Sequence, residues 1–272
     1  MKGAANRLGI ELLSTFGMPP LEFVPLVSDL GCRNLSIGLT GLPMIDCGYP
    51  EWSLRDDARL RGAFIAALRE HGVGISQGEG FLVRSGTSVT NFAGDLDLMA
   101  EMGALAVGTA GMEPDESRAF DEFAVLAEIA GDRGLAVHLE FVPGLSVSDL
   151  ASALAVVEHV GRRDFRVMID AMHFFRSGGT IAQLSAVDPA KIGYVQLCDA
   201  PLAAAQPEYM TEAMTARCLP GEGQLPLADL IRALPNDIPI GLEIPNFAAT
   251  SEPGWQDRWL RKAVEAARSL GA

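Results

Sequence analysis

The sequence of 272 residues contains little cysteine, little histidine and few positive charges. Its four cysteines, Cys32, Cys47, Cys198 and Cys218, are widely spread and form no CxxC pair, so neither a disulfide scaffold nor a zinc ribbon is indicated. There are 21 Lys and Arg residues against 35 Asp and Glu residues, which gives a formal net charge of −14. Such a surface repels phosphate backbones and anionic lipids, so we expect neither nucleic acid nor membrane as a partner.

Long hydrophobic runs are also missing. No apolar stretch approaches the roughly 20 residues that a membrane-spanning helix needs. The run from Leu8 to Leu13 is short and contains Glu11, unlike a signal peptide. With 49% hydrophobic and 21% charged residues, the composition is that of a globular protein, and we expect a cytoplasmic location. No low-complexity segment or linker divides the chain, so residues 1–272 are expected to form a single domain.

Eight short apolar runs recur along the chain, separated by longer segments with a helical hydrophobic period. They start at Leu8, Asn34, Val73, Ala104, Ala136, Arg166, Ile192 and Pro239. The runs start roughly thirty residues apart, the length of one unit in a 250-residue βα barrel. Residues 55–70, 115–130, 148–160 and 255–270 have the pattern of helices. This alternation predicts an α/β fold, a single (β/α)8 TIM barrel in preference to an open doubly wound sheet. No GxGxxG motif follows the first run, so no nucleotide cofactor is expected.

Oxygen-bearing side chains lie at or near the ends of the last four predicted strands. We call Glu140, Asp170, Gln196 and Glu243 the strand-end set. In a βα barrel the active site lies at the carboxyl ends of the strands, and side chains alternate along a strand, so the set is predicted to converge. Three carboxylates in one place repel one another unless a positive charge compensates them. We therefore predict one divalent cation held by the strand-end set. All-oxygen ligands suit Mg²⁺ or Mn²⁺ better than zinc, with Co²⁺ as a further candidate.

The strand-end acids also allow a simpler interpretation, in which each one pairs with an arginine of a loop or caps a helix. Three residues near them are held as minor candidates. His138 is predicted to be a core histidine one layer below Glu140, and Glu11 and Glu79 can line the mouth of the barrel.

Two loop residues are predicted to contact the substrate. His173 follows Asp170 on the loop that leaves the sixth strand, where a metal ligand or a surface residue are the alternatives. Arg217 precedes the PGEG sequence of residues 220–223. Its guanidinium suits a carboxylate, phosphate or enolate oxygen, and a salt bridge within the loop is the alternative.

The motifs around these residues resemble the xylose-isomerase-like barrel superfamily of sugar-phosphate isomerases and epimerases. The resemblance spans nearly the whole chain and lies in HLEF (138–141), IDAMHFFRSGG (169–179), YVQLCDAP (194–201), the R-x-x-PGEG element from Arg217, and LEIP (242–245). It implies that a Glu, an Asp, a His and a second Glu hold one divalent metal, which by position assigns Glu140, Asp170 and Glu243. It also implies that the two glutamates move protons and that His173 and Arg217 contact substrate oxygens.

Gln196 departs from this family pattern, because sugar epimerases have a histidine at the corresponding position. The string QLCDAP followed by R-x-x-PGEG is similar to bacterial 3-dehydroshikimate dehydratases of the same superfamily. The resemblance to those enzymes implies glutamine as the fourth ligand of a Mg²⁺-type ion. The metal set is then kept, while the reaction that it serves is either isomerisation or β-elimination.

These observations predict a divalent-metal-dependent isomerase or epimerase that removes a proton next to a carbonyl of a small polyhydroxylated substrate, a sugar or a sugar phosphate. A lyase of the 3-dehydroshikimate-dehydratase type on the same metal site is the alternative. A phosphodiesterase similar to apurinic endonucleases needs several zinc ions and many histidines, against which the 4 histidines and the charge of −14 argue. A non-catalytic binding module is a further alternative. The resemblance also implies homo-oligomers that form through exposed helices.

Overall fold

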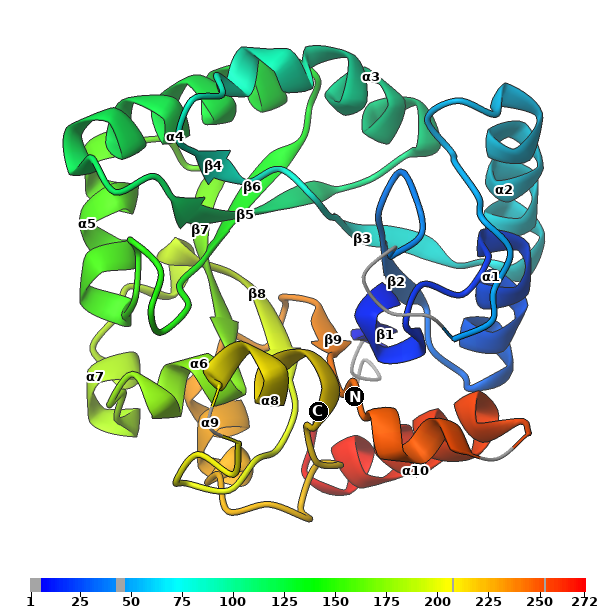
Figure 1. Ribbon diagram of the computed structural model, residues 1–272. Helices are drawn as coiled ribbons and strands as arrows, with labels where there is room; N and C mark the ends of the chain where they lie inside the picture. The colour runs from blue at the N-terminus through cyan, green and yellow to red at the C-terminus, as the bar shows by residue number, and fades with distance from the viewer. Residues whose placement is uncertain (1–5, 43–46, 207, 252) are drawn as a thin grey trace.

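Eight parallel strands close into a barrel in this computed structural model, which describes residues 6–42, 47–206, 208–251 and 253–272. The barrel strands are β1 (Leu8–Ile10), β2 (Asn34–Ile37), β3 (Gly74–Gly78), β5 (Ala106–Met112), β6 (Ala136–Glu140), β7 (Phe165–Asp170), β8 (Ile192–Leu197) and β9 (Ile240–Leu242). The sheet closes because β3 pairs with β5 and β9 pairs with β1, both in parallel. Figure 1 shows this barrel inside a ring of helices. The predicted (β/α)8 TIM barrel is confirmed.

Each of the eight predicted runs overlaps one barrel strand, but the prediction missed β4 (Val83–Arg84). This strand pairs with β5 at Gly111 and Met112, beyond the point where β3 pairs at Val107. A strand of two residues has no measurable alternation, so the hydrophobic pattern could not reveal it.

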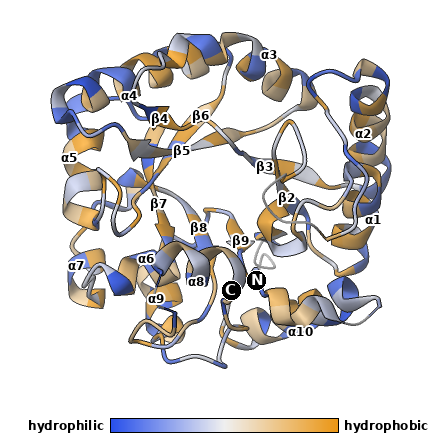
Figure 2. Ribbon diagram, viewed as in Figure 1, coloured by the Kyte–Doolittle hydropathy of each residue, from blue (hydrophilic) through white to orange (hydrophobic). Residues whose placement is uncertain are grey.

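Helices surround the barrel and connect its strands. They are α1 (Pro20–Asp29), α2 (Ala58–His71), α3 (Ala93–Met102), α4 (Glu116–Gly131), α5 (Leu150–Val160), α6 (Ala171–Arg176), α7 (Ile181–Ser185), α8 (Tyr209–Thr215), α9 (Leu227–Ala233) and α10 (Trp255–Ser269). Short 3₁₀ turns are η1 (Leu12–Thr15), η2 (Val89–Phe92), η3 (Pro189–Lys191) and η4 (Phe247–Ser251). Figure 2 shows hydrophilic and hydrophobic residues alternating along the ring helices, as one buried face requires. None of the helices in the described ranges combines the length and the apolar composition of a membrane-spanning helix.

Capping residues explain where the predicted helices begin and end. The Asp57 side chain accepts hydrogen bonds from the first turn of α2, and Gly72 ends that helix in the left-handed conformation at φ 61°. Asp115 caps α4 and Asp149 caps α5 in the same way. The predicted ranges left out the other six helices of the described residues. Among these, α1 contains Pro25, which interrupts a helical pattern, and α3 has a weak apolar period.

The interior of the barrel contains polar side chains in addition to the usual apolar layers. The hydroxyl of Tyr194 donates to Glu11 Oε1 at 2.5 Å, and the side chain of Glu11 is completely buried. The ring of His138 stacks on that of Tyr194 and its Nδ1 lies 2.8 Å from Gln77 Oε1, so His138 is a hydrogen-bonded core residue. These bonds repay part of the cost of burying polar groups.

Two glycines on the strands provide the space that these polar side chains fill. A Cβ atom at Gly241 would overlap the Glu11 carboxylate and would lie 2.7 Å from the Tyr194 hydroxyl oxygen. A Cβ atom at Gly193 would overlap the ring of His138. Neither glycine has a positive φ, so close approach, and not backbone conformation, is what requires glycine there.

We predict that Gly241→Ala lowers the free energy of unfolding by about 1–3 kcal/mol, because the added methyl group overpacks the barrel interior. Gly62→Ala is the matched control, since Gly62 lies exposed in α2 with nothing within 4 Å of its Cβ position. The control should gain about 0.5–1 kcal/mol from helix propensity. Urea unfolding measures both. Equal midpoints for Gly241→Ala and the unchanged protein would show that Glu11 does not occupy this space.

Candidate metal centre and active site

The strand-end set lies at the carboxyl end of the barrel. Glu140 and Asp170 are the last residues of β6 and β7, and Glu243 directly follows β9. Asp170 is paired in register with Gln196, so these two side chains lie at one level. Glu140 is paired with Met168, two residues before Asp170, and Gln196 is paired with Gly241, two residues before Glu243. The amide nitrogen of Gln196 donates to Glu243 Oε1 at 2.9 Å. The four residues therefore come from neighbouring strands at the predicted end of the barrel.

Asp170 also fixes His173 through a local helix cap. Its Oδ1 accepts a hydrogen bond from the backbone N–H of His173 at 2.8 Å and begins α6. The cap places the His173 side chain, which is almost fully buried, above the end of β7. Its Nε2 lies 3.4 Å from Glu140 Oε1. The D-x-x-H spacing thus joins an N-cap aspartate to a histidine in the first turn of the helix that it caps.

Arg217 is buried among the acids of the strand-end set. Its Nη1 pairs with the Asp170 carboxylate and its Nη2 lies 3.0 Å from Glu243 Oε2. Nε donates to the carbonyl oxygen of Ala213 at 2.7 Å. The side chain is 2% exposed, so this ion pair is removed from water. One positive charge among the acids is therefore supplied by the chain itself.

The charges of the site shift its pKa values. Burial alone would raise the pKa of Asp170, but Arg217 and then His173 outweigh it and lower that pKa below its usual value. Burial raises the pKa of Glu243 well above its usual value, Arg217 opposes this, and the charge of Glu140 adds to it. Burial lowers the pKa of Arg217, yet Asp170 and other anionic neighbours hold it well above its usual value. Arg217 is therefore a permanent cation.

The residues present fit a divalent cation. Glu140, Asp170 and His173 each offer one ligand atom, and these atoms lie within 4.8 Å of one another. Beside them, Gln196 Oε1 is buried and has no hydrogen-bond partner among the described residues. A buried oxygen without a donor is costly unless a cation or a water binds it. The site is thus a possible metal site with carboxylate, amide and imidazole donors.

Two further carboxyl groups lie next to this set. Glu11 directly follows β1 and is fully buried, while Glu79 directly follows β3, is half-buried and accepts a hydrogen bond from Ser36 Oγ. Burial, and then the charge of Glu79, raises the pKa of Glu11 to about 8. Burial also raises the pKa of Glu79, and the charge of Glu140 adds to this. The end of the barrel is therefore richer in acid than the strand-end set alone.

The PGEG sequence belongs to a loop that closes around Asp199. The Asp199 carboxylate accepts hydrogen bonds from the backbone N–H groups of Gly221 at 2.8 Å and Leu225 at 3.0 Å. A Cβ atom at Gly223 would overlap this carboxylate, which is why a glycine is needed there. These bonds fix the end of the segment that follows Arg217. The backbone N–H groups of Gly221 and Leu225 are thus occupied by a carboxylate of the chain itself.

Sequence reasoning missed Tyr209 and the ion pair beside it. The Tyr209 hydroxyl lies 2.6 Å from His173 Nδ1. Arg176 Nη2 lies 2.7 Å from Glu212 Oε1, and both side chains are buried. In α6, Arg176 follows His173 by three residues, and in α8, Glu212 follows Tyr209 by three residues. This shared i, i+3 spacing is the sequence signal for the contact between the two helices. It cannot be recognised until the two helices are known to be neighbours.

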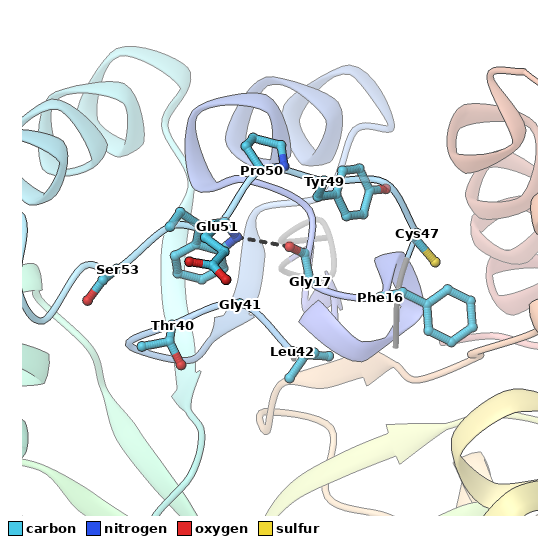
Figure 3. A pocket seen from close by; sticks show the side chains of 11 residues that line it. Phe16, Gly17, Thr40, Gly41, Leu42, Cys47, Tyr49, Pro50, Glu51 and Ser53 are labelled. Carbon is cyan, nitrogen blue, oxygen red and sulfur yellow. Dashed lines mark hydrogen bonds between the residues drawn. The ribbon is translucent and has the colours of Figure 1, made fainter. Parts of the chain in front are cut away.

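A cavity of about 650 Å³ lies at the same end of the barrel, between η1 and the segment that follows β2. Aromatic rings of Phe16, Tyr49 and Trp52 line it, with polar side chains such as Thr40. Trp52 Nε1 donates to the carbonyl oxygen of Gly17 at 2.9 Å, drawn as a dashed line in Figure 3. The cavity thus adds an aromatic wall at the same end of the barrel as the acids.

Two curated proteins are similar to parts of the chain. The 3-dehydroshikimate dehydratase of Pseudomonas putida is 28% identical over 183 residues, which make up 64% of this chain and 28% of that protein. The inosose isomerase of Halalkalibacterium halodurans is 36% identical over 76 residues, which make up 27% of this chain and 27% of that protein. Both matches span less than a third of the relative's own length.

Similarity to solved structures covers nearly the whole chain. The IolI protein, in a crystal structure with a zinc atom bound, superposes with a TM-score of 0.76 at 18% identity, over 97% of this chain and 96% of that chain. This shows a shared fold. A family model described as xylose isomerase-like TIM barrel matches residues 26–271. An isomerase and a dehydratase are thus among the relatives, and the chain belongs to the xylose isomerase-like TIM barrel family.

Proposed function

We propose that this protein is a divalent-metal-dependent isomerase or epimerase. Its reaction removes a proton from the carbon next to a carbonyl in a small polyhydroxylated substrate, a sugar or a sugar phosphate. The observation that supports this most is the convergence of the strand-end set, with the unpartnered Gln196 Oε1, at the end of a barrel where such enzymes bind their substrates. The inosose isomerase among the relatives supports an isomerase.

In this proposal the oxygens of the strand-end set hold one Mg²⁺ or Mn²⁺ ion, with Co²⁺ as a further candidate. When bound, a divalent ion stabilises the negative charge that develops on a substrate carbonyl oxygen, by several kcal/mol. The zinc atom in the IolI structure supports a divalent ion in this fold. Arg217 lowers the negative charge of the set by one, which reduces the repulsion among the three carboxylates.

Glu140 and Glu243 are the proposed acid and base. They come from β6 and from the residue after β9, with β7 and β8 between them. Two carboxyl groups on either side of a substrate carbon allow one to take its proton and the other to return a proton. A positioned carboxylate contributes roughly 10²–10⁴-fold to such a step. Return to the opposite face gives an epimer, and return to the neighbouring carbon gives the aldose–ketose isomer.

His173 and Arg217 are the proposed substrate-binding residues. Both are buried next to the acids, and both present nitrogen atoms that can donate to substrate oxygens. Pairing with Asp170 and Glu243 fixes the guanidinium plane of Arg217 from two sides. A group held in this way needs no reorganisation when negative charge develops on an oxygen beside it.

A dehydratase of the 3-dehydroshikimate type is the second candidate. Gln196 favours it, because the sequence around this residue is similar to that of such enzymes, and so does the Pseudomonas putida relative, which matches 64% of the chain. The first step is the same, and expulsion of a β-hydroxyl group then gives a conjugated enone. Ultraviolet absorbance rises when a conjugated product forms and stays constant during isomerisation, so one spectrophotometric trace separates the two candidates.

We predict that Glu140→Gln and Glu243→Gln each slow solvent deuterium incorporation into keto-sugars and cyclic keto-polyols by at least about 100-fold. Mass spectrometry of the substrate with Mn²⁺ present measures the exchange, whatever the fate of the deprotonated substrate. Glu158→Gln is the matched control, because Glu158 is exposed and pairs with Lys191. It should exchange at the rate of the unchanged protein. Exchange at that rate in either of the other two variants would remove that glutamate from the mechanism.

We also predict that Asp170→Ala and Asp170→Asn weaken Mn²⁺ binding at least about 100-fold in titration calorimetry, because each variant removes a charged ligand. The asparagine variant keeps the side-chain volume and an oxygen that can cap α6, which separates metal loss from local unfolding. Asp257→Ala, at an exposed pair with Arg261, is the control and should bind normally. Unchanged metal content of both Asp170 variants in elemental analysis would count against the strand-end set.

A further inference from the structure

His173 has a defined partner at each ring nitrogen. Nδ1 lies 2.6 Å from the hydroxyl oxygen of Tyr209, and Nε2 lies 3.4 Å from Glu140 Oε1. The Asp170 carboxylate is 3.9 Å from Nδ1, too far for a hydrogen bond. A neutral imidazole has one nitrogen that donates and one that accepts, so the two partners together decide where the proton lies.

Only one arrangement of a neutral His173 suits both partners. The carboxylate of Glu140 can only accept, whereas the hydroxyl of Tyr209 can donate or accept. A proton on Nε2 is attracted by the Glu140 carboxylate 3.4 Å away, and the Tyr209 hydroxyl then donates to the bare Nδ1. The opposite tautomer would turn the lone pair of Nε2 towards a carboxylate oxygen, which is repulsive.

Tyr209 is held in place independently of His173. His173 and Arg176 are three residues apart in α6, and Tyr209 and Glu212 are three residues apart in α8. The Arg176–Glu212 ion pair, at 2.7 Å, is buried and ties the two helices together one turn away from the Tyr209–His173 contact. Glu212 Oε2 also accepts from the backbone N–H of Ala205 at 2.9 Å. Figure 1 shows α8 beside α6 at the end of the barrel.

Burial, and then the charge of Asp170, raises the pKa of the Tyr209 hydroxyl, so this group keeps its proton. A hydroxyl that keeps its proton can donate it to a ring nitrogen at hydrogen-bond distance. The positions of Tyr209 and Glu140 and their hydrogen-bonding capacity therefore favour the same tautomer, with the proton on Nε2.

We propose that Tyr209 is a positioning residue that holds His173 in the tautomer with its proton on Nε2. His173 then acts as a hydrogen-bond donor beside Glu140 and is not a metal ligand. The oxygens of the strand-end set then bind the cation, although His173 lies close enough to Glu140 and Asp170 to ligate it with them. The donor role towards a substrate oxygen rests on the proposed function, whereas the tautomer does not depend on any reaction.

Imidazole NMR tests this directly, because the chain has only 4 histidines. In protein labelled with ¹⁵N-histidine, the two-bond proton–nitrogen pattern reports which ring nitrogen carries the proton. His173→Gln assigns the His173 signals by their loss. The expected spectrum of the unchanged protein has a protonated Nε2 and a bare Nδ1, and these signals persist when saturating Mg²⁺ is added.

Tyr209→Phe removes only the hydroxyl that donates to Nδ1. Glu140 alone then favours the proton on Nε2, and we predict that a measurable share of His173 carries its proton on Nδ1 instead. Tyr49→Phe is the matched control, because the Tyr49 hydroxyl is bonded to Gln256 and not to His173. It should leave the His173 pattern unchanged. A proton on Nδ1 in the unchanged protein, or an Nε2 that loses its proton when Zn²⁺ or Mg²⁺ binds, would overturn the proposal. A failed deuterium-exchange experiment would instead count against the proposed function and leave the tautomer assignment intact.

Discussion

Unbalanced negative charge at the carboxyl end of the barrel is the constraint on which the rest of the site depends. Strand ends bring Glu140, Asp170 and Glu243 together, and Glu11 and Glu79 lie beside them. Two unit charges 4 Å apart interact by about 4 kcal/mol even at an effective dielectric constant of 20. The chain answers this repulsion with the buried guanidinium of Arg217, which pairs with two of the acids. Removing one partner of such a buried pair typically costs about 3–5 kcal/mol.

The scaffold is adapted to polar groups as well as to apolar packing. Gly241 and Gly193 leave space inside the barrel where a side chain would collide with Glu11 or His138. Tyr194 contacts both of these residues, by a hydrogen bond to Glu11 and by stacking on His138. Hydrogen-bonded side chains therefore pack in the barrel interior next to the strand-end set. Side chains supported by such packing lose little conformational entropy when a ligand binds.

The connection between β8 and α9 supplies two further residues to the site. The segment between β8 and α9 contains Tyr209, which contacts His173, and Arg217, which contacts Asp170 and Glu243. Asp199 fixes one end of this segment through the backbone of Gly221. This one connection thus contains both the tyrosine that contacts the imidazole of His173 and the guanidinium that pairs with the acids. Outside α8, the conformation of this connection is set by side-chain hydrogen bonds such as those of Asp199.

The barrel and the end at which its acids lie could be predicted from the sequence, because both follow from local rules. Alternation along AVHLE and RVMID places Glu140 and Asp170 on inward faces at strand ends, and the barrel rule places those ends together. The partners of Arg217 and Tyr209 could not be predicted in the same way. Tyr209 begins the short helix α8, and Arg217 lies on the irregular segment that follows it. Their contacts with the site join residues 26 to 47 positions apart.

Gln196 is the residue of the strand-end set whose role as a metal ligand most needs a direct test. The sequence has an amide where the resemblance to sugar epimerases implies a histidine, and the structure shows its oxygen buried without a donor among the described residues. The most direct test is the anomalous scattering of a crystal grown with Mn²⁺. We expect one strong peak per chain, within bonding distance of oxygens of Glu140, Asp170, Gln196 and Glu243, and with His173 outside bonding distance. A peak elsewhere in the molecule, or one bonded to His173 and not to Gln196, would contradict this expectation.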